Sequence, residues 1–496
     1  MKKYILKNNF LIVFTVLLLS NFSCTNFLEE EVYTEYDPDS FLATQEGIDA
    51  LLTGVYSGST VTGFEARNYY YILSEFVTDI SFETDGGLAT QLKPVQEFNW
   101  NSGLPYIDGL WNQMYQAISR ANNVINVTKT LSSTDQDVID KIVAECRFIR
   151  GYSYFYLHGF FGPTPIIEIP ADASLDEIEA IGKTSPRATE AEYRAYVEAD
   201  LQFAASTLAA GGYSSRANKG NAYAALCKFY LSNKEWQKAA DAANTVLGLG
   251  YTLYPDYTKL FSIEGENNNE FILRTECKVG SNQVNIYMPH AFPQRYRVLP
   301  NWTNYGAQFR TYTAFVETFE LQDERRKLFL TEYIPNNTTE VQYMLRDPVT
   351  GVALDNARSF KYVPDPAAVN TQHGNDIPLI RLADIMLTRA EALNELNGPT
   401  QEAIDLINQV RNRAKATPIA LGDYPNKESL RDFLLAERGR ELYTEQARRD
   451  DLIRHGKFVS NAIERGWPAK DYMNLYPIPQ AQMDNNPNLV QNPGYN

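Results

Sequence analysis

Paired amphipathic helices are the strongest structural signal in this chain of 496 residues. Residues 382–393 consist mainly of strong helix formers, and Gly398 with Pro399 then stops the helix. A second helix follows at once, and its apolar face consists of Ala403, Ile404, Ile407 and Val410. Because such a face has to be covered, residues 379–414 predict a helical hairpin that packs on further neighbours.

Opposite charges are closely spaced in the next helical segment, residues 428–456. Pairs that stand three or four positions apart meet on one side of a helix. Such pairs are Arg438 with Glu441, Glu445 with Arg448, and Glu445 with Arg449. We predict that they stabilise the helix against its neighbours and take no part in catalysis.

Apolar stripes at helical spacing also recur in the first half of the chain. One contains Trp111, and another follows Thr189-x-x-Glu192, a pattern typical of a helix N-terminus. Residues 223–239 have the spacing of a tetratricopeptide repeat. We therefore predict a mainly α fold in which four tetratricopeptide-like helix pairs form a superhelical scaffold. The pairs are expected near residues 40–125, 135–208, 218–250 and 379–456.

The middle of the chain lacks this helical periodicity. Residues 251–376 are rich in Tyr, Asn and Pro, with short β-like pieces such as 270–274. Long irregular segments in a compact protein usually have a function. We expect a loop-rich, ligand-facing region here, packed on a helical scaffold formed by residues 40–250 and 377–460.

The N-terminus has the composition of a secretory signal. Lysines precede an apolar run at residues 10–19, which is too short to span a bilayer, and Cys24 follows shortly after. The segment resembles a bacterial lipoprotein signal, although Asn21 stands where the usual motif has Leu. We predict a signal peptide over residues 1–23, lipidation of Cys24, and a single domain over 24–496.

The charge of the chain limits its partners. With 45 basic and 61 acidic residues, the formal net charge is -16. Nucleic acid and anionic lipid headgroups are therefore poor partners, and membrane attachment has to come from acyl chains.

No arrangement of residues typical of a catalytic or metal site occurs in the sequence. The four His residues are far apart, and nucleophile elbows and phosphate loops are missing, so we predict no enzyme activity, no metal and no cofactor. Cys146, Cys227 and Cys277 lack metal-ligand spacing and are expected to be buried thiols. A secreted glycoside hydrolase remains an alternative, since its two carboxylates have no fixed sequence spacing.

Three separated blocks of the C-terminal third resemble the SusD/RagB family, the nutrient-binding surface lipoproteins of Bacteroidetes. The blocks are LIRLAD at 379–384, ERGREL at 437–442 with RRDDLIRHG at 448–456, and YPIP at 476–479 with NNPNLVQNPGY at 485–495. The resemblance implies a SusD-like fold. It also implies an outer-membrane, cell-surface location and a SusC-like TonB-dependent transporter as partner.

Aromatic residues in loops are the candidates for ligand binding. The chain has 32 Tyr, 25 Phe and 5 Trp, and flat rings bind the apolar C–H faces of sugars while amides and charged groups bind the hydroxyls. Matching to SusD-like glycan binders singles out Trp100 and Trp302. The full predicted ligand-binding set is Asp79, Trp100, Asn101, Tyr296, Trp302 and Tyr305. A loop Trp can also be a core residue, and for Trp111 and Trp236 packing is expected.

The sequence therefore predicts a noncatalytic outer-membrane lipoprotein that binds an oligosaccharide and, as the resemblance implies, delivers it to the transporter. A RagB-like protein that takes up peptides is the main alternative, in which case the acidic charge would favour cationic peptides. A further alternative is a tetratricopeptide adaptor for protein partners. The secretory signal, Cys24 and the long aromatic insertions argue against a bare solenoid of this kind.

Overall fold

The computed structural model describes residues 44–57, 64–83, 87, 89–129, 131, 135–170, 172–211, 216–306 and 308–495. The chain separates into two compact units, Met1–Gly47 and Ile48–Asn496, and the fold described below is that of the second unit. The predicted signal peptide and Cys24 lie outside the described residues.

Helices make up most of the unit, so the predicted mainly α class is confirmed. The helices before residue 250 are α3 (Gln45–Ser57), α4 (Phe64–Glu75), α5 (Ala89–Gln96), α6 (Pro105–Thr128), α7 (Gln136–Phe161), α8 (Leu175–Thr184), α9 (Glu190–Thr207), α10 (Lys219–Ser232) and α11 (Trp236–Leu247). Those after it are α12 (Tyr287–Ala291), α13 (Thr313–Val316), α14 (Leu382–Asn397), α15 (Gln401–Arg413), α16 (Lys427–Leu442), α17 (Arg448–Arg454), α18 (Phe458–Glu464) and α19 (Gln480–Asn485). Among the described residues, no helix has the length and apolar character needed to cross a bilayer.

Local sequence sets the ends of these helices. α9 begins with the predicted capping box, in which Thr189 and Glu192 each bind the other's backbone N–H. α14 ends at Gly398, whose φ of 77° is a left-handed conformation that glycine adopts without strain. The three predicted buried thiols, Cys146, Cys227 and Cys277, are buried and free.

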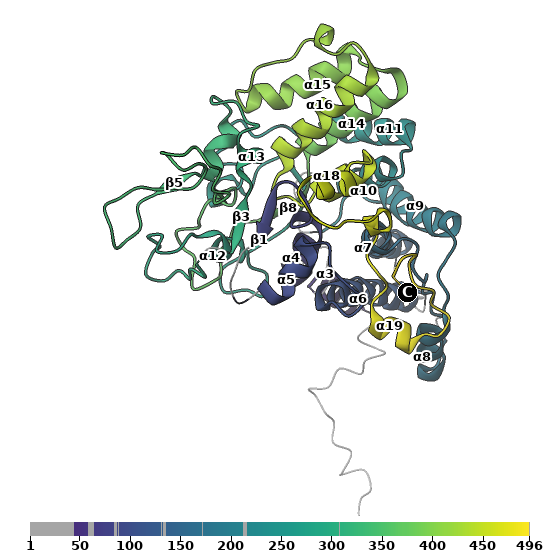
Figure 1. The fold of residues 1–496 in the computed structure, drawn as a ribbon. Coiled ribbons are helices and arrows are strands. Elements are labelled where there is room, and N and C mark those ends of the chain that lie inside the picture. The colour runs from purple at the N-terminus through teal and green to yellow at the C-terminus, as the bar shows by residue number, and fades with distance from the viewer. Residues whose placement is uncertain are drawn as a thin grey trace, which may run out of the picture. The chain divides into compact units, whose positions relative to one another are not determined.

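Successive helices pack side by side to form the scaffold. α6 packs on α7, α7 on α9, α9 on α10, α10 on α11, and α14 on both α15 and α16. α11 also packs directly on α14, although 134 residues separate them in the chain. Residues 248–381 are therefore an insertion between two neighbouring helices, and Figure 1 shows them as teal and green loops and short strands beside the helical layers.

The insertion contains the predicted small β pieces, with 3₁₀ turns η2 (Ile263–Gly265) and η3 (Glu324–Leu328). Its strands are β2 (Phe271–Thr275), β3 (Phe309–Thr311), β4 (Phe329–Leu330), β5 (Glu332–Tyr333), β6 (Gln342–Tyr343), β7 (Arg358–Ser359) and β8 (Ile377–Arg381), and β1 (Ser81–Glu83) precedes them. Four antiparallel pairs form, β1 with β3, β2 with β8, β4 with β7, and β5 with β6. Because β2 pairs with β8, the beginning and the end of the insertion lie together at the point where α14 starts.

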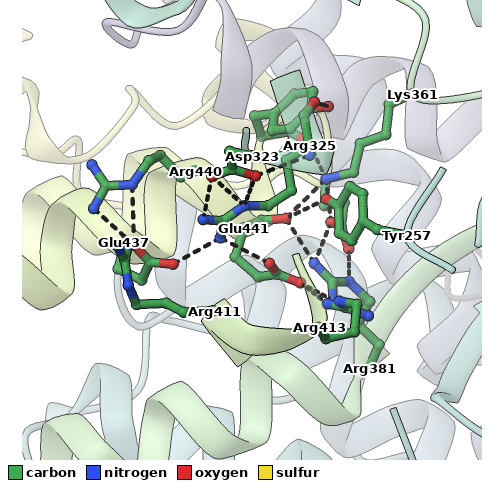
Figure 2. A network of polar contacts seen from close by, with 12 residues as sticks. Tyr257, Asp323, Arg325, Lys361, Arg381, Arg411, Arg413, Glu437, Arg440 and Glu441 are labelled. Carbon is green, nitrogen blue, oxygen red and sulfur yellow. Dashed lines mark hydrogen bonds and ion pairs between the residues drawn. The ribbon is translucent and has the colours of Figure 1, made fainter. Parts of the chain in front are cut away.

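A buried network of charges joins the insertion to α16 (Figure 2). Glu437 and Glu441 of α16 have no exposed surface. Arg325 of the insertion, itself fully buried, lies 2.7 Å from Glu437 and 3.0 Å from Glu441. Arg411, Arg440, Arg381 and Arg413 supply further ion pairs to the same two carboxylates. A buried carboxylate is tolerated only with such partners, so the network fixes the insertion to the scaffold.

The three ion pairs predicted within residues 428–456 are wrong, although the same side chains do bind neighbouring elements, as predicted. α16 ends at Leu442 and α17 begins only at Arg448, so Glu445 lies in the turn between them and cannot pair with Arg449 along one helix. Glu445 instead binds Lys361 and Arg381, and Arg448 binds Asp79. Arg438 binds Asp384 and Asp451. Arg449 donates to the backbone oxygens of Gly159 and Asn474. These side chains thus join separate elements.

A candidate ligand-binding surface in the loop-rich region

Three rings lie nearly parallel where α12 leads into an irregular loop. Phe292, directly after α12, is fully buried. The ring of Tyr296 lies 5.6 Å from it with an interplanar angle of 10°, and that of Trp302 lies 5.7 Å from it at 8°. Tyr296 and Trp302 are half-buried, so each ring packs on the core and still has accessible surface.

Hydrogen bonds from distant segments fix the backbone of this loop. The Asn336 N–H donates to Arg295 O at 2.9 Å, and the Thr303 N–H donates to Asn370 O at 2.8 Å. Arg295 and Asn370 both have φ of 56°, a left-handed conformation that non-glycine residues rarely adopt. Tyr333, at the end of β5, donates its hydroxyl to Gln294 O at 2.8 Å. The loop is therefore held in place before any ligand arrives.

The accessible side chains suit a hydroxylated ligand. Tyr305 is 49% exposed, and its ring lies 4.8 Å from that of His290. Arg295 and Arg297 are exposed on either side of Tyr296. Aromatic rings offer flat apolar contact, and guanidinium groups donate hydrogen bonds to oxygen. We call the surface formed by five residues of this loop the aromatic loop surface: Arg295, Tyr296, Arg297, Trp302 and Tyr305.

Two buried N–H groups beneath this surface have no acceptor in the described part of the chain. One is Nε1 of Trp302 and the other is Nε2 of His373, and the two rings are 5.6 Å apart. His373 Nδ1 accepts the Asp365 N–H, which leaves the ring proton on Nε2. Burial lowers the pKa of His373 to about 4, so its ring is neutral at pH 7. Buried donors normally have partners, and this pair can bind an oxygen that reaches the rings.

Trp100, by contrast, belongs to the core. It is 5% exposed, and its Nε1 donates to the hydroxyl of Tyr495 at 2.8 Å. Its ring lies 4.9 Å from Phe98 and 4.8 Å from Tyr476. Of the two readings of this loop Trp, ligand binding and core packing, the structure places Trp100 in the core, because the C-terminal segment covers it.

Asp79 and Asn101 serve the local fold. Asp79 binds Arg448 through two contacts of 2.7 Å. Burial would raise the pKa of Asp79, but the positive charge of Arg448 outweighs it and lowers the pKa below the usual value. Asn101 is exposed, and its Oδ1 accepts the Gly103 N–H at 2.9 Å just before α6.

The predicted set thus separates into two groups. Tyr296, Trp302 and Tyr305 come together on the aromatic loop surface. Asp79 instead binds α17, Trp100 binds the C-terminal segment, and Asn101 binds the loop that precedes α6. Sequence reasoning missed Tyr333 and His373, whose rings lie against Tyr296 and Trp302 although they are more than 25 residues away in the chain. Among the described residues, no group of three or more His, Cys, Asp and Glu side chains could hold a metal ion.

Comparison with known proteins gives consistent results along the chain. A family model described as the SusD family matches residues 248–495, and one described as "Starch-binding associating with outer membrane" matches residues 26–231. SusD-like protein P2 of Formosa agariphila is 28% identical over 523 aligned residues, which cover 100% of both chains. The starch-binding protein SusD of Bacteroides thetaiotaomicron is 24% identical over 465 residues, 80% of each chain. A solved structure described as a laminarin-binding SusD-like protein has a TM-score of 0.75 at 23% identity and covers 91% of this chain and 100% of its own.

Proposed function

The chain belongs to the SusD family, and from this premise we propose that it is a noncatalytic surface lipoprotein that binds an oligosaccharide and delivers it to a SusC-like TonB-dependent transporter. The observation that supports the binding step most directly is the aromatic loop surface, with its accessible rings, flanking guanidinium groups and two buried N–H donors. Starch and laminarin appear in the descriptions of relatives, which supports a glycan as ligand.

The surface fits capture better than hydrolysis. A glycosidase needs two carboxyl groups flanking the scissile bond. The five residues of the aromatic loop surface include no carboxylate, and burial keeps the neighbouring His373 neutral at pH 7. Rings and donors of this kind hold a sugar without transferring a proton to its glycosidic oxygen.

Removal of a stacking ring should weaken sugar binding without unfolding the protein. We expect Tyr305→Ala and Trp302→Ala each to lower affinity about tenfold, or roughly 1 to 2 kcal/mol, because the apolar contact with the sugar face is lost. Soluble protein that starts after Cys24 should first be screened against laminarin, starch oligosaccharides, other glycans and peptides. Calorimetric titration of each variant with the best ligand then measures the change.

Trp236→Ala is the matched control, since Trp236 is also half-buried but lies at the start of α11. It should leave affinity unchanged. Unchanged affinity in both Tyr305→Ala and Trp302→Ala would remove the aromatic loop surface from the ligand site. Peptide binding with no glycan binding would support the RagB-like alternative.

Attachment to the outer membrane is the second part of the proposal. Stable anchoring takes two or more acyl chains, each buried methylene contributing about 0.8 kcal/mol. Cys24→Ala should therefore release the protein from the membrane fraction into the soluble fraction, as measured by fractionation and immunoblotting. Retention of the Cys24→Ala protein after a high-salt wash would contradict a lipid anchor at this residue.

A further inference from the structure

A cavity of about 360 Å³ lies among the scaffold helices, apart from the aromatic loop surface. Its walls come from α7, α10, the junction of β8 with α14, and the turn between α16 and α17. The volume is within the range of roughly 300 to 1,000 Å³ that is typical of small-molecule sites. Ser232 and Lys234 line the cavity and are exposed, so it can be reached from the surface.

One wall of the cavity is aromatic. Tyr152, Phe155, Tyr156 and Phe160 of α7 line it, together with Tyr70 of α4. Phe155 is only half-buried, so its ring has accessible surface. Tyr152 and Tyr156 share a hydrogen bond of 2.8 Å between their hydroxyls, which fixes the orientation of both rings. This wall can take the apolar face of a ligand.

Most charged side chains around the cavity already have partners in the scaffold. Arg381 binds Glu270, Glu441 and Glu445, and Arg454 binds Glu391 and Asp451. Lys228 lies 2.7 Å from Asp384. His158 lies 2.9 Å from Glu190. In the Arg–carboxylate and Lys–carboxylate pairs the charges neutralise one another, so these pairs give the cavity little preference for an ion of either sign.

Three polar groups on the lining remain available. Gln446 is 5% exposed, and its Oε1 has no hydrogen-bond partner in the described part of the chain. Asp450 has a side chain that is 38% exposed and a single contact of 3.2 Å with Arg449. Burial raises the pKa of Asp450, although the positive charges of Arg449, Lys228 and Arg454 oppose this effect. Lys234 is exposed at the edge.

The turn between α16 and α17 holds Gln446 at the cavity. Gln446 has φ of 69° and Thr444 has φ of 63°, both left-handed conformations. The Gln446 N–H donates to Oε1 of Glu75, a fully buried side chain, at 2.6 Å. A conformation that costs energy is kept only where the surroundings enforce it, and here it places Gln446, whose Oε1 has no partner among the described residues, at the cavity wall.

We propose that this cavity is a second saccharide site, which binds one or two sugar rings independently of the aromatic loop surface. Sugar hydroxyls can donate to Asp450 and to Gln446 Oε1 and can accept from Lys234, while the C–H face packs on Phe155. The available groups include one negative and one positive charge, so a neutral polyhydroxylated ligand matches them better than an ion does. The inference rests on the proposed function only for the class of ligand.

The test uses a variant that fills the cavity. Ala447 lines the cavity and is half-buried, so Ala447→Phe places a ring inside it. Asp450→Asn removes one available charge at nearly constant shape. Ala210→Phe is the matched control, because Ala210 is exposed and does not line the cavity. The wild type, these three variants and a separate Trp302→Ala protein are each titrated with maltose, laminaribiose and a panel of free hexoses and pentoses by saturation-transfer NMR. The melting temperature of each protein is also recorded.

At least one of these sugars should bind the wild type, the Ala210→Phe protein and the Trp302→Ala protein alike. Its affinity should fall at least tenfold in Ala447→Phe and three- to tenfold in Asp450→Asn, with melting temperatures unchanged. If Ala447→Phe does not fold, Asp450→Asn alone decides the outcome. The proposal is overturned if every sugar that binds the wild type fails to bind Trp302→Ala but still binds the two cavity variants. It is also overturned if no sugar in the panel binds the wild type. Failure of the proposed function is a separate result, in which Trp302→Ala and Tyr305→Ala do not change glycan affinity.

Discussion

Replacing Arg325 with Met should destabilise the protein by about 3 to 5 kcal/mol, because the change removes the buried cation that three carboxylates share. Arg325 has no exposed surface, and it binds Asp323 at 2.7 Å as well as Glu437 and Glu441. Met keeps much of the apolar volume of the arginine side chain, so the loss of stability would report on the missing positive charge. Urea unfolding at pH 7, followed by circular dichroism, measures it.

The pH dependence of wild-type stability checks the same network. Burial would raise the pKa values of Glu437 and Glu441, but the charges of Arg325 and its neighbouring arginines lower both to about 2. Both carboxyls have a lower pKa in the folded protein than the usual 4.5. Their contribution to stability is therefore complete above pH 4.5 and should be lost as the pH falls towards 2.

Arg346→Met is the matched control for the Arg325 variant. Arg346 pairs with Glu317 at the surface, where the two side chains are 49% and 35% exposed. Exposed pairs contribute roughly 0 to 1 kcal/mol, so this variant should unfold almost like the wild type. An Arg325→Met protein as stable as the Arg346→Met protein would show that the insertion does not depend on this network.

Trp100→Ala should cost about 3 to 5 kcal/mol of stability, because the indole would leave a cavity between Phe98 and Tyr476 and would leave the Tyr495 hydroxyl without its donor. Thermal melting measures this loss. The folded fraction of the variant should bind its glycan with unchanged affinity, since the ring of Trp100 has almost no accessible surface.

Trp100→Phe separates packing from hydrogen bonding at this position. Phe keeps a ring in the core but not the donor, so it should cost less than Ala. Intact melting of Trp100→Ala together with weaker glycan binding would contradict the core assignment and return Trp100 to the ligand site.

Local patterns predicted the scaffold well and the tertiary contacts poorly. The helices around Thr189 and Gly398 follow from capping residues and periodicity, which act over a few positions. The turn after Leu442 has no such signal, since neither Thr444 nor Gln446 is a typical left-handed residue. The predicted partner of Arg449 was wrong for this reason.

Trp100 and Trp302 show the same limit for the ligand site. Both stand in loops next to Asn, and local composition does not separate them. Trp100 is buried because Tyr495, 395 positions later, covers it. The ring of Trp302 packs on Phe292 and His373, but no distant segment of the described chain covers it as Tyr495 covers Trp100, and it stays half-buried. Which of two similar loops faces solvent depends on long-range packing.

The insertion between α11 and α14 has a consequence for exchange of binding specificity between relatives. Its two ends lie together in the β2–β8 pair, so a foreign segment could join the scaffold without stretching either helix. The buried ion pairs restrict such an exchange, since Arg325 and Lys361 of the insertion bind carboxylates of the α16 region. A chimaera that takes its loops from another chain would therefore need to inherit both cations, or to receive a scaffold whose glutamates are replaced as well.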